Sequence, residues 1–224
     1  MRVLILLTLS CLISACSYDT NESGDQALPV SRNPILAQAG LINIKEVDRS
    51  IRVDLQYKKP SPISDRPLYE PQFPALLKPE TAERLKQANK IVKAHGFRIM
   101  IWDAYRPPSV QMDLWNASGH NDTFVANPHN APSQHSCGTA VDVTLVTSRG
   151  KEVKMPTSFD AFTPAAASRY QHTDPEIKKN LHILQDAMRQ AGFYPLPAEW
   201  WHYIDKNYKK YPNTIPLKAV RSAF

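Results

Sequence analysis

Proline is the residue type that most limits what this chain can fold into. The sequence of 224 residues contains 19 prolines against 7 glycines. Proline fixes φ and has no backbone N–H group, so it does not sit inside helices or central strands. We therefore expect helices and strands that are separated by long, ordered turns. The length fits one domain, because single hydrophobic cores commonly reach this size.

The N-terminus has the pattern of an export signal. Residues 1–15, MRVLILLTLSCLISA, place one basic residue before an apolar run that ends in small residues. The run is shorter than the ~20 apolar residues of a membrane-spanning helix, so a transmembrane segment is the weaker interpretation. Its end resembles the bacterial lipoprotein signal, in which the following cysteine, here Cys16, is lipidated and becomes the first residue.

We accordingly expect a periplasmic protein that is anchored to the outer membrane by lipidated Cys16. Ser17 follows this cysteine in place of an aspartate, which by the same resemblance favours the outer membrane. The alternative is an ordinary cleaved signal with a soluble periplasmic product. Residues 17 to 38 are polar and show no apolar period, so we expect 16–40 to be a flexible tether and 41–224 to be the folded domain.

Charge and cysteine content narrow the range of partners. The net charge is +6 and falls to +5 when the signal leaves with its single basic residue. The basic residues are scattered without a run of the nucleic-acid-binding type, so we expect no DNA or RNA partner, and no obligatory protein partner is indicated. With Cys11 in the signal and Cys16 lipidated, Cys137 has no internal partner for a disulfide.

Apolar periodicity predicts an α+β fold, a single domain in which helices flank a small, mainly antiparallel sheet. Few βαβ units occur, which argues against a doubly wound sheet. Helices are predicted from Pro79 to Gly96, and from Pro175 to Gly192 with Asp174 as N-cap. Alternating or buried apolar runs predict strands at 51–55, 97–102, 139–146 and 199–204.

Two short clusters carry the candidate catalytic residues. The first is SQHSCGTAVD at 133–142 and the second is EWWHY at 199–203. Together they supply two imidazoles and a carboxylate, which are three protein ligands for a catalytic zinc that keeps its fourth position for water. Glu199 precedes His202 by three residues, so a helical turn or a bulge could aim both at one metal. A regular strand would face them oppositely.

A cysteine nucleophile is the competing interpretation of the first cluster. Cys137 lies two residues after His135 and could pair with it. No other feature of a cysteine peptidase accompanies this pair, and a small thiol beside a glycine more often serves packing. The sequence therefore favours a metal site over a thiol mechanism.

The motifs resemble those of the D-alanyl-D-alanine dipeptidases of the VanX type, a branch of the zinc D,D-peptidases. Ser-x-His-x-x-Gly-x-Ala-x-Asp stands at 133–142, Glu-Trp-Trp-His-Tyr at 199–203 and Asp-Ala-Tyr-Arg-Pro at 103–107. The match covers most of the chain after Leu41. The resemblance implies one zinc ion bound by His135, Asp142 and His202, with Glu199 as general base and Arg106 as the stabiliser of the transition state.

The resemblance also implies how a substrate would be held. Tyr57 and Asp160 would bind its ammonium end, and Ser133 would bind its carboxylate. Two departures affect these roles. Pro156 stands where the family usually has a glycine, and Lys58 begins a segment that differs from the usual aromatic and polar run. Substrate preference could differ from that of the family as a result.

The predicted function is zinc-dependent hydrolysis of D-Ala-D-Ala outside the cytoplasmic membrane. One alternative is a D,D-carboxypeptidase that acts on peptidoglycan stem peptides with the same chemistry. Another is a non-catalytic lipoprotein that binds cell-wall peptides through a degenerate site. Every catalytic position is filled, which argues against the binding protein. The Glu-Trp-Trp-His-Tyr motif favours the dipeptidase. An outer-membrane location would keep peptidoglycan nearby, so the carboxypeptidase remains an alternative.

Overall fold

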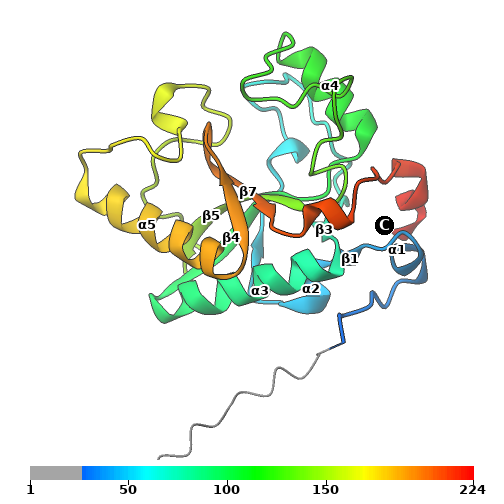
Figure 1. The fold of residues 1–224 in the computed structure, drawn as a ribbon, viewed down its shortest axis with the longest axis horizontal. Helices are drawn as coiled ribbons and strands as arrows, with labels where there is room; N and C mark the ends of the chain where they lie inside the picture. Colours follow the sequence, from blue (N-terminus) through cyan, green and yellow to red (C-terminus); the bar gives the residue numbers. More distant parts are fainter. Residues whose placement is uncertain (1–26) are drawn as a thin grey trace, which may run out of the picture.

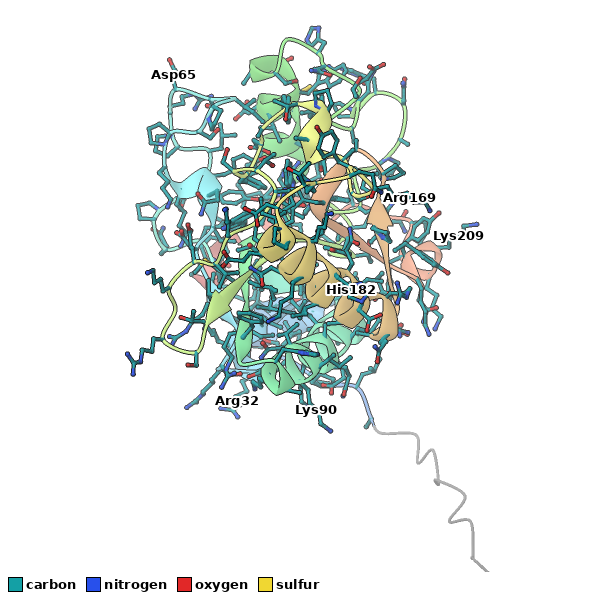
Figure 2. All side chains as sticks on the ribbon, turned by 90° about the vertical axis from the view of Figure 1, so that its left-hand side faces the viewer. Arg32, Asp65, Lys90, Arg169, His182 and Lys209 are labelled. Carbon is teal, nitrogen blue, oxygen red and sulfur yellow. The ribbon has the colours of Figure 1, made fainter. Side chains whose placement is uncertain are left out.

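The computed structural model describes residues 27–224, shown in Figure 1. The predicted signal at 1–15 and the predicted lipidation site at Cys16 lie outside the described residues. Within the described part of the chain, no helix is both long enough and apolar enough to cross a membrane. Basic side chains lie apart on the surface, with Arg32 and Lys90 at the lower edge of Figure 2 and Arg169 and Lys209 at the right.

A five-stranded mixed sheet forms the centre of the fold, with the strand order β2-β4-β5-β7-β6. β2 pairs with β4 in parallel, and the other pairs are antiparallel. A second, two-stranded sheet joins β1 to β3. The strands are β1 Ile42–Asn43, β2 Arg52–Val53, β3 Leu76–Leu77, β4 Phe97–Asp103, β5 Ala140–Thr147, β6 Phe193–Leu196 and β7 Glu199–Asp205.

The helices complete an α+β architecture, which confirms the predicted fold class. The α-helices are α1 Pro34–Gln38, α2 Ile44–Val47, α3 Pro79–Ala94, α4 Pro108–Ala117 and α5 Pro175–Gln190. Short 3₁₀ segments are η1 Gln56–Lys58, η2 Pro164–Ala166, η3 Tyr208–Lys210, η4 Leu217–Ala219 and η5 Arg221–Ala223. The longest helices, α3 and α5, contact each other and the sheet, as Figure 1 shows.

Both long helices begin as the sequence predicts. Each has proline in its first turn, and the Asp174 side chain accepts hydrogen bonds from the backbone N–H groups of Glu176 and Ile177. α3 stops before Gly96, which adopts a φ of +82°. The predicted apolar faces are buried against the sheet and include Leu85, Ala88, Val92, Leu181, Leu184 and Met188.

The last part of the predicted tether belongs to the fold, so the boundary at residue 40 is wrong. Asn33 caps α1 and donates a hydrogen bond from Nδ2 to the carbonyl of Ala223 at 3.2 Å. Leu36 is 3% exposed, and Ser31 donates to Glu46 at 2.8 Å. A helix of a single turn buries too few side chains to produce an apolar period, which is why the sequence pattern missed it.

The predicted strand at 51–55 is also shorter than expected. Only Arg52 and Val53 pair with β4, and the chain then turns into η1. Ile51 and Leu55 are buried all the same, at 0% and 2% exposure. The alternating pattern therefore predicted correctly which side chains are buried, but it did not predict which residues pair with the neighbouring strand. The turn after Leu55 brings Tyr57 into the core, at 2% exposure.

Candidate active site

The register of three strands assembles the proposed metal ligands. Asp142, near the start of β5, lies opposite His202 of β7 on one side and opposite Asp103 of β4 on the other. Residues paired across an antiparallel ladder point to the same face of a sheet, so these side chains converge. His135 joins them from the loop that precedes β5, where its ring is 2% exposed.

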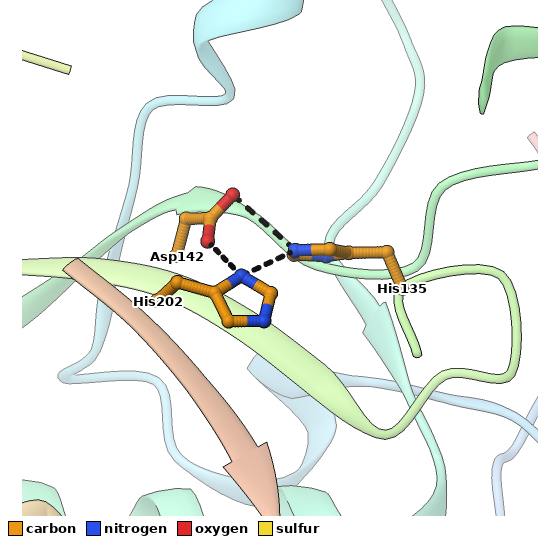
Figure 3. A group of neighbouring side chains, drawn as sticks. All are labelled: His135, Asp142 and His202. Atoms are coloured by element: carbon orange, nitrogen blue, oxygen red, sulfur yellow. Dashed lines mark hydrogen bonds and ion pairs between the residues drawn. The ribbon is translucent and has the colours of Figure 1, made fainter. Parts of the chain in front are cut away.

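The three ligand side chains present their donor atoms to one point, as Figure 3 shows. His135 Nε2 lies 3.4 Å from Asp142 Oδ2 and 3.2 Å from His202 Nδ1. His202 Nδ1 lies 2.9 Å from Asp142 Oδ1. A tetrahedral zinc ion with bonds of about 2.0–2.1 Å separates its ligand atoms by about 3.3 Å, close to this spacing.

The second nitrogen of His135 fixes which atom is free for the metal. His135 Nδ1 donates to the carbonyl oxygen of Ala104 at 2.6 Å, so Nε2 carries a lone pair. His202 Nδ1 and the Asp142 carboxylate face the same point with further lone pairs. Acceptor atoms gathered in this way need a cation between them, and His135, Asp142 and His202 therefore fit a zinc ion.

Glu199 reaches this group because β7 is irregular. The regular pairing of β7 with β6 is interrupted between Pro195 and Leu196, and Leu196 then pairs with Glu199. This bulge brings Glu199 Oε2 to 3.9 Å from His202 Nδ1, in the way that the sequence left open. Burial, and then the negative charges of Asp142 and Asp160, hold the pKa of the Glu199 carboxyl well above its usual range.

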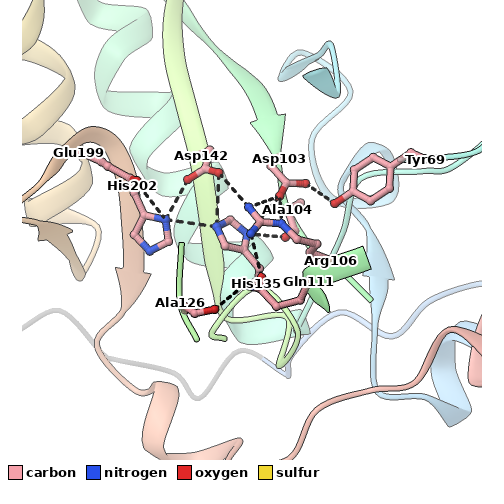
Figure 4. A network of polar contacts seen from close by, with 10 residues as sticks. All are labelled: Tyr69, Asp103, Ala104, Arg106, Gln111, Ala126, His135, Asp142, Glu199 and His202. Atoms are coloured by element: carbon pink, nitrogen blue, oxygen red, sulfur yellow. Dashed lines mark hydrogen bonds and ion pairs between the residues drawn. The ribbon is translucent and has the colours of Figure 1, made fainter. Parts of the chain in front are cut away.

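Arg106 is fixed at the edge of the metal group by a buried polar network, drawn in Figure 4. Its Nε and Nη2 donate to Asp103 Oδ2, each at 2.8 Å, and its Nη1 donates to Gln111 Oε1 at 2.9 Å. Tyr69 donates to the other oxygen of Asp103 at 2.6 Å. Nη2 also lies 3.6 Å from Asp142 Oδ2, so the guanidinium is held in a fixed position beside the proposed metal ligands.

One cavity of about 170 Å³ joins all the predicted site residues. Pockets for drug-sized ligands measure about 300–1,000 Å³, so this space suits a small molecule. A larger hollow of about 850 Å³ lies between α3 and the end of α5, away from these residues. The predicted residues that line the small cavity are Tyr57, Arg106, Ser133, His135, Asp142, Asp160, Glu199 and His202.

Asp160 combines two features that cost stability. Its backbone has a φ of +54°, in a region that non-glycine residues rarely adopt, and its Oδ2 is buried without a hydrogen-bond partner among the described residues. Burial, and next the charge of Asp142, raise the pKa of this carboxyl to about 8. A cationic ligand group would offset the cost of the unpaired oxygen. Asp160 therefore presents a buried carboxyl to the cavity.

Cys137 does not have the surroundings of a nucleophile. It is 1% exposed and is not among the residues that line the cavity. Burial raises the pKa of its thiol, which disfavours the reactive thiolate. The ring of His135 faces Asp142 and His202 instead. The geometry thus leaves the cysteine-nucleophile alternative without support.

Gly138 holds the ligand-bearing loop against α3. Its φ is +75°, and a Cβ there would lie 2.8 Å from Leu41 Cδ2 and 3.3 Å from the Lys78 backbone nitrogen. We expect Gly138→Ala to lower the free energy of unfolding by about 2–3 kcal/mol, since backbone strain and steric overlap add. Gly96→Ala is the matched control, because its φ is +82° with no atom within 4 Å, and it should cost only about 1 kcal/mol.

Denaturant unfolding of both variants measures this difference. Equal losses for Gly138→Ala and Gly96→Ala would contradict the steric role of Gly138.

Several residues of the site were not assigned roles from the sequence. Asp103 lies in a quoted motif, three residues before Arg106, and that spacing was the available signal for an ion pair. Gln111 and Tyr69 complete the same network but come from α4 and from the loop before β3, at positions that no spacing connects. The apolar wall of the cavity is contributed by Leu114, Phe124, Val125, Leu196 and Trp201.

A buried His-Asp-His group that could hold a metal, with a carboxyl of raised pKa beside it, is typical of the class of metal-dependent hydrolases. The family model described as D-Ala-D-Ala dipeptidase matches residues 37–221. The chain belongs to this peptidase family, and the predicted resemblance is confirmed. It is accordingly a metallopeptidase, and its His-Asp-His group fits the zinc that such peptidases use.

Curated relatives carry the same name. The D-alanyl-D-alanine dipeptidase of Escherichia coli K12 is 27% identical over 172 residues, which cover 77% of this chain and 88% of that protein. The D-alanyl-D-alanine dipeptidase of Enterococcus faecium is 25% identical over 202 residues, which cover 81% and 100%.

Among solved structures, the vancomycin-resistance D,D-pentapeptidase VanY, in complex with Zn(II), is similar at 18% identity with a TM-score of 0.39, covering 67% of this chain and 86% of that one.

Proposed function

We propose that this protein hydrolyses D-Ala-D-Ala to two D-alanines with one zinc ion, outside the cytoplasmic membrane. The observation that carries the proposal is the single small cavity onto which the metal group, Glu199, Arg106 and Asp160 all open. A volume of about 170 Å³ suits a small dipeptide, which favours the dipeptidase over the carboxypeptidase.

The ligand set defines what the metal contributes. His135, Asp142 and His202 would hold the zinc, which when bound would supply a Lewis acid and a water of pKa about 7. Glu199 takes the proton of the attacking water and passes it to the leaving amine as the C–N bond breaks. Its raised pKa, caused first by burial, suits a group that must both accept and release a proton.

Arg106 supplies positive charge where the oxyanion develops. Its guanidinium is held by Asp103 and Gln111 before substrate arrives, so little reorganisation is needed in the transition state. At the ammonium end, Asp160 offers its unpaired oxygen beside Tyr57. Ser133, at the cavity wall, is the proposed partner of the substrate carboxylate.

An assay with three substrates tests the proposed function. Purified protein loaded with zinc is incubated with D-Ala-D-Ala, L-Ala-L-Ala and a stem pentapeptide that ends in D-Ala-D-Ala, and released alanine is measured. We expect release from D-Ala-D-Ala that exceeds release from the other two by at least about 100-fold, since a small site built around polar groups discriminates strongly. Preferred release from the pentapeptide would replace this proposal with the carboxypeptidase.

We also propose that the protein is exported and attached to the outer membrane through lipidated Cys16. The support is the signal-like sequence MRVLILLTLSCLISA that precedes this cysteine. We expect Cys16→Ser to move the protein from the membrane fraction to the soluble periplasmic fraction. The catalytic domain should keep its kcat, because the described site begins at Tyr57. Unmodified protein that is soluble with a free N-terminus would disprove lipidation.

A further inference from the structure

The two loops on either side of β5 both contribute to the cavity wall. The first, residues 118–139 between α4 and β5, contributes Phe124 and Ser133 to its wall. The second, residues 148–174 between β5 and α5, contributes Asp160. In Figure 1 the two loops rise on opposite sides above the sheet, one green and one yellow. The two loops therefore flank the site from opposite sides.

Each loop is fixed at its base by contacts with the core of the site. Ala126 of the first loop accepts a hydrogen bond from Gln111 Nε2 at 2.8 Å. In the second loop, Thr157 accepts a hydrogen bond from Trp200 Nε1 at 2.9 Å. The ring of Phe159 packs edge-on against Trp201, with centroids 5.8 Å apart. Both loops are thus supported from below, on separate elements.

The loops meet through one pair of aromatic rings. Phe124 and Phe162 stack with their centroids 4.4 Å apart and their planes inclined by 11°. Within residues 27–224, none of the hydrogen bonds or ion pairs joins one loop to the other. Both rings are half-buried, and their stack joins the two loops directly.

We propose that the Phe124–Phe162 stack is a clasp that limits the substrate to a free dipeptide. Phe162 follows Asp160 by two residues in the same loop, and it stacks on Phe124 from the opposite loop. Phe124 lines the cavity itself. A group attached to the substrate nitrogen would have to occupy the space that these rings fill. The clasp is thus a specificity determinant, and the inference rests on the proposed function.

Opening the clasp should change which substrates are accepted. We expect Phe162→Ala to raise kcat/KM for N-acetyl-D-Ala-D-Ala, relative to D-Ala-D-Ala, by about tenfold, which is the factor that loss of one aromatic pair corresponds to. Phe162→Tyr preserves the stack and should keep the ratio of the unmodified protein. Tyr170→Ala removes an exposed aromatic ring from the same loop outside the clasp, and it too should leave the ratio unchanged.

A double-mutant cycle tests whether the two rings act as a unit. If they do, Phe124→Ala and Phe162→Ala together should shift the ratio no further than either change alone. Zinc content and thermal unfolding are measured for every variant. Should an alanine variant not fold, Phe162→Leu keeps apolar volume without the stack and gives the same measurement.

The outcomes separate this inference from the function on which it rests. Unmodified protein that does not hydrolyse D-Ala-D-Ala would refute the proposed function and the clasp together. Active unmodified protein whose substrate ratio is the same in Phe162→Ala, Phe162→Leu and Phe162→Tyr would refute the clasp alone.

Discussion

Replacing Glu199 by glutamine is expected to lower kcat for D-Ala-D-Ala by about 10²–10⁴-fold, the usual contribution of a positioned general acid–base. Glutamine keeps the size of the side chain and can still form hydrogen bonds, but it cannot accept a proton from water. The variant should keep one equivalent of zinc, because Glu199 lies 3.9 Å from His202 and is not one of the three converging ligands. Metal analysis and steady-state kinetics on the same sample measure both quantities.

His202→Ala is the matched comparison. It removes one of the three proposed metal-ligand atoms, which lie within about 3.4 Å of one another. We therefore expect loss of both zinc and activity. Chelation of the unmodified protein should abolish hydrolysis, and added zinc should restore it. A Glu199→Gln protein that lacks zinc would show that Glu199 is a ligand. Full activity of metal-free protein would overturn the metal mechanism altogether.

The parts of the fold that follow from local chemistry were predictable from the sequence. α5 is an example, because Asp174 and Pro175 define its start and Leu181, Leu184 and Met188 recur on one face. β5 is another, since its residues alternate between the two sides of the sheet. Both sides of β5 proved to be buried, including the polar one, with Asp142 and Thr144 each 2% exposed. The alternation predicted the strand but not the burial of both of its faces.

Features that depend on distant contacts were not predictable. α1 is held against the C-terminal end of the chain. Asn33 and Pro34 form a local helix start, but the helix has only 5 residues and no apolar repeat. α4 was not predicted, although it starts at Pro108, because its buried face repeats only once and includes the polar Gln111. The bulge that brings Glu199 beside His202 depends on the pairing of β6 with β7, which no spacing reveals.

The candidate site likewise has features that the sequence predicted and features that depend on the folded structure. A motif resemblance pointed to eight residues, and the structure places them all around one cavity. The positive φ of Asp160 and its unpaired oxygen are properties of the folded loop, so no residue pattern contained them. The departure at Pro156 does not remove Asp160 from the cavity.

N-acetyl-D-Ala-D-Ala is expected to be hydrolysed up to about 10⁴-fold more slowly than D-Ala-D-Ala, measured as kcat/KM. A free ammonium pairs with Asp160 through a charge-assisted hydrogen bond, whereas an acylated nitrogen has no charge and leaves the buried carboxylate unpaired. Sites built to pair a polar group reject analogues that lack it by factors of this size. The pairing is available because Asp160 Oδ2 has no hydrogen-bond partner within the described structure.

Substitution of Asp160 separates charge pairing from steric exclusion. Asp160→Ala should reduce the difference in kcat/KM between the two substrates, mainly by lowering kcat/KM for the free dipeptide, because the ammonium loses its partner. Asp160→Asn keeps the shape of the side chain and should slow the free dipeptide as well, since the charge is gone. Phe162→Ala should instead reduce this difference by raising kcat/KM for the acetylated substrate. Comparable kcat/KM for the two substrates in the unmodified protein would contradict the role of Asp160 and favour a carboxypeptidase that accepts peptide stems.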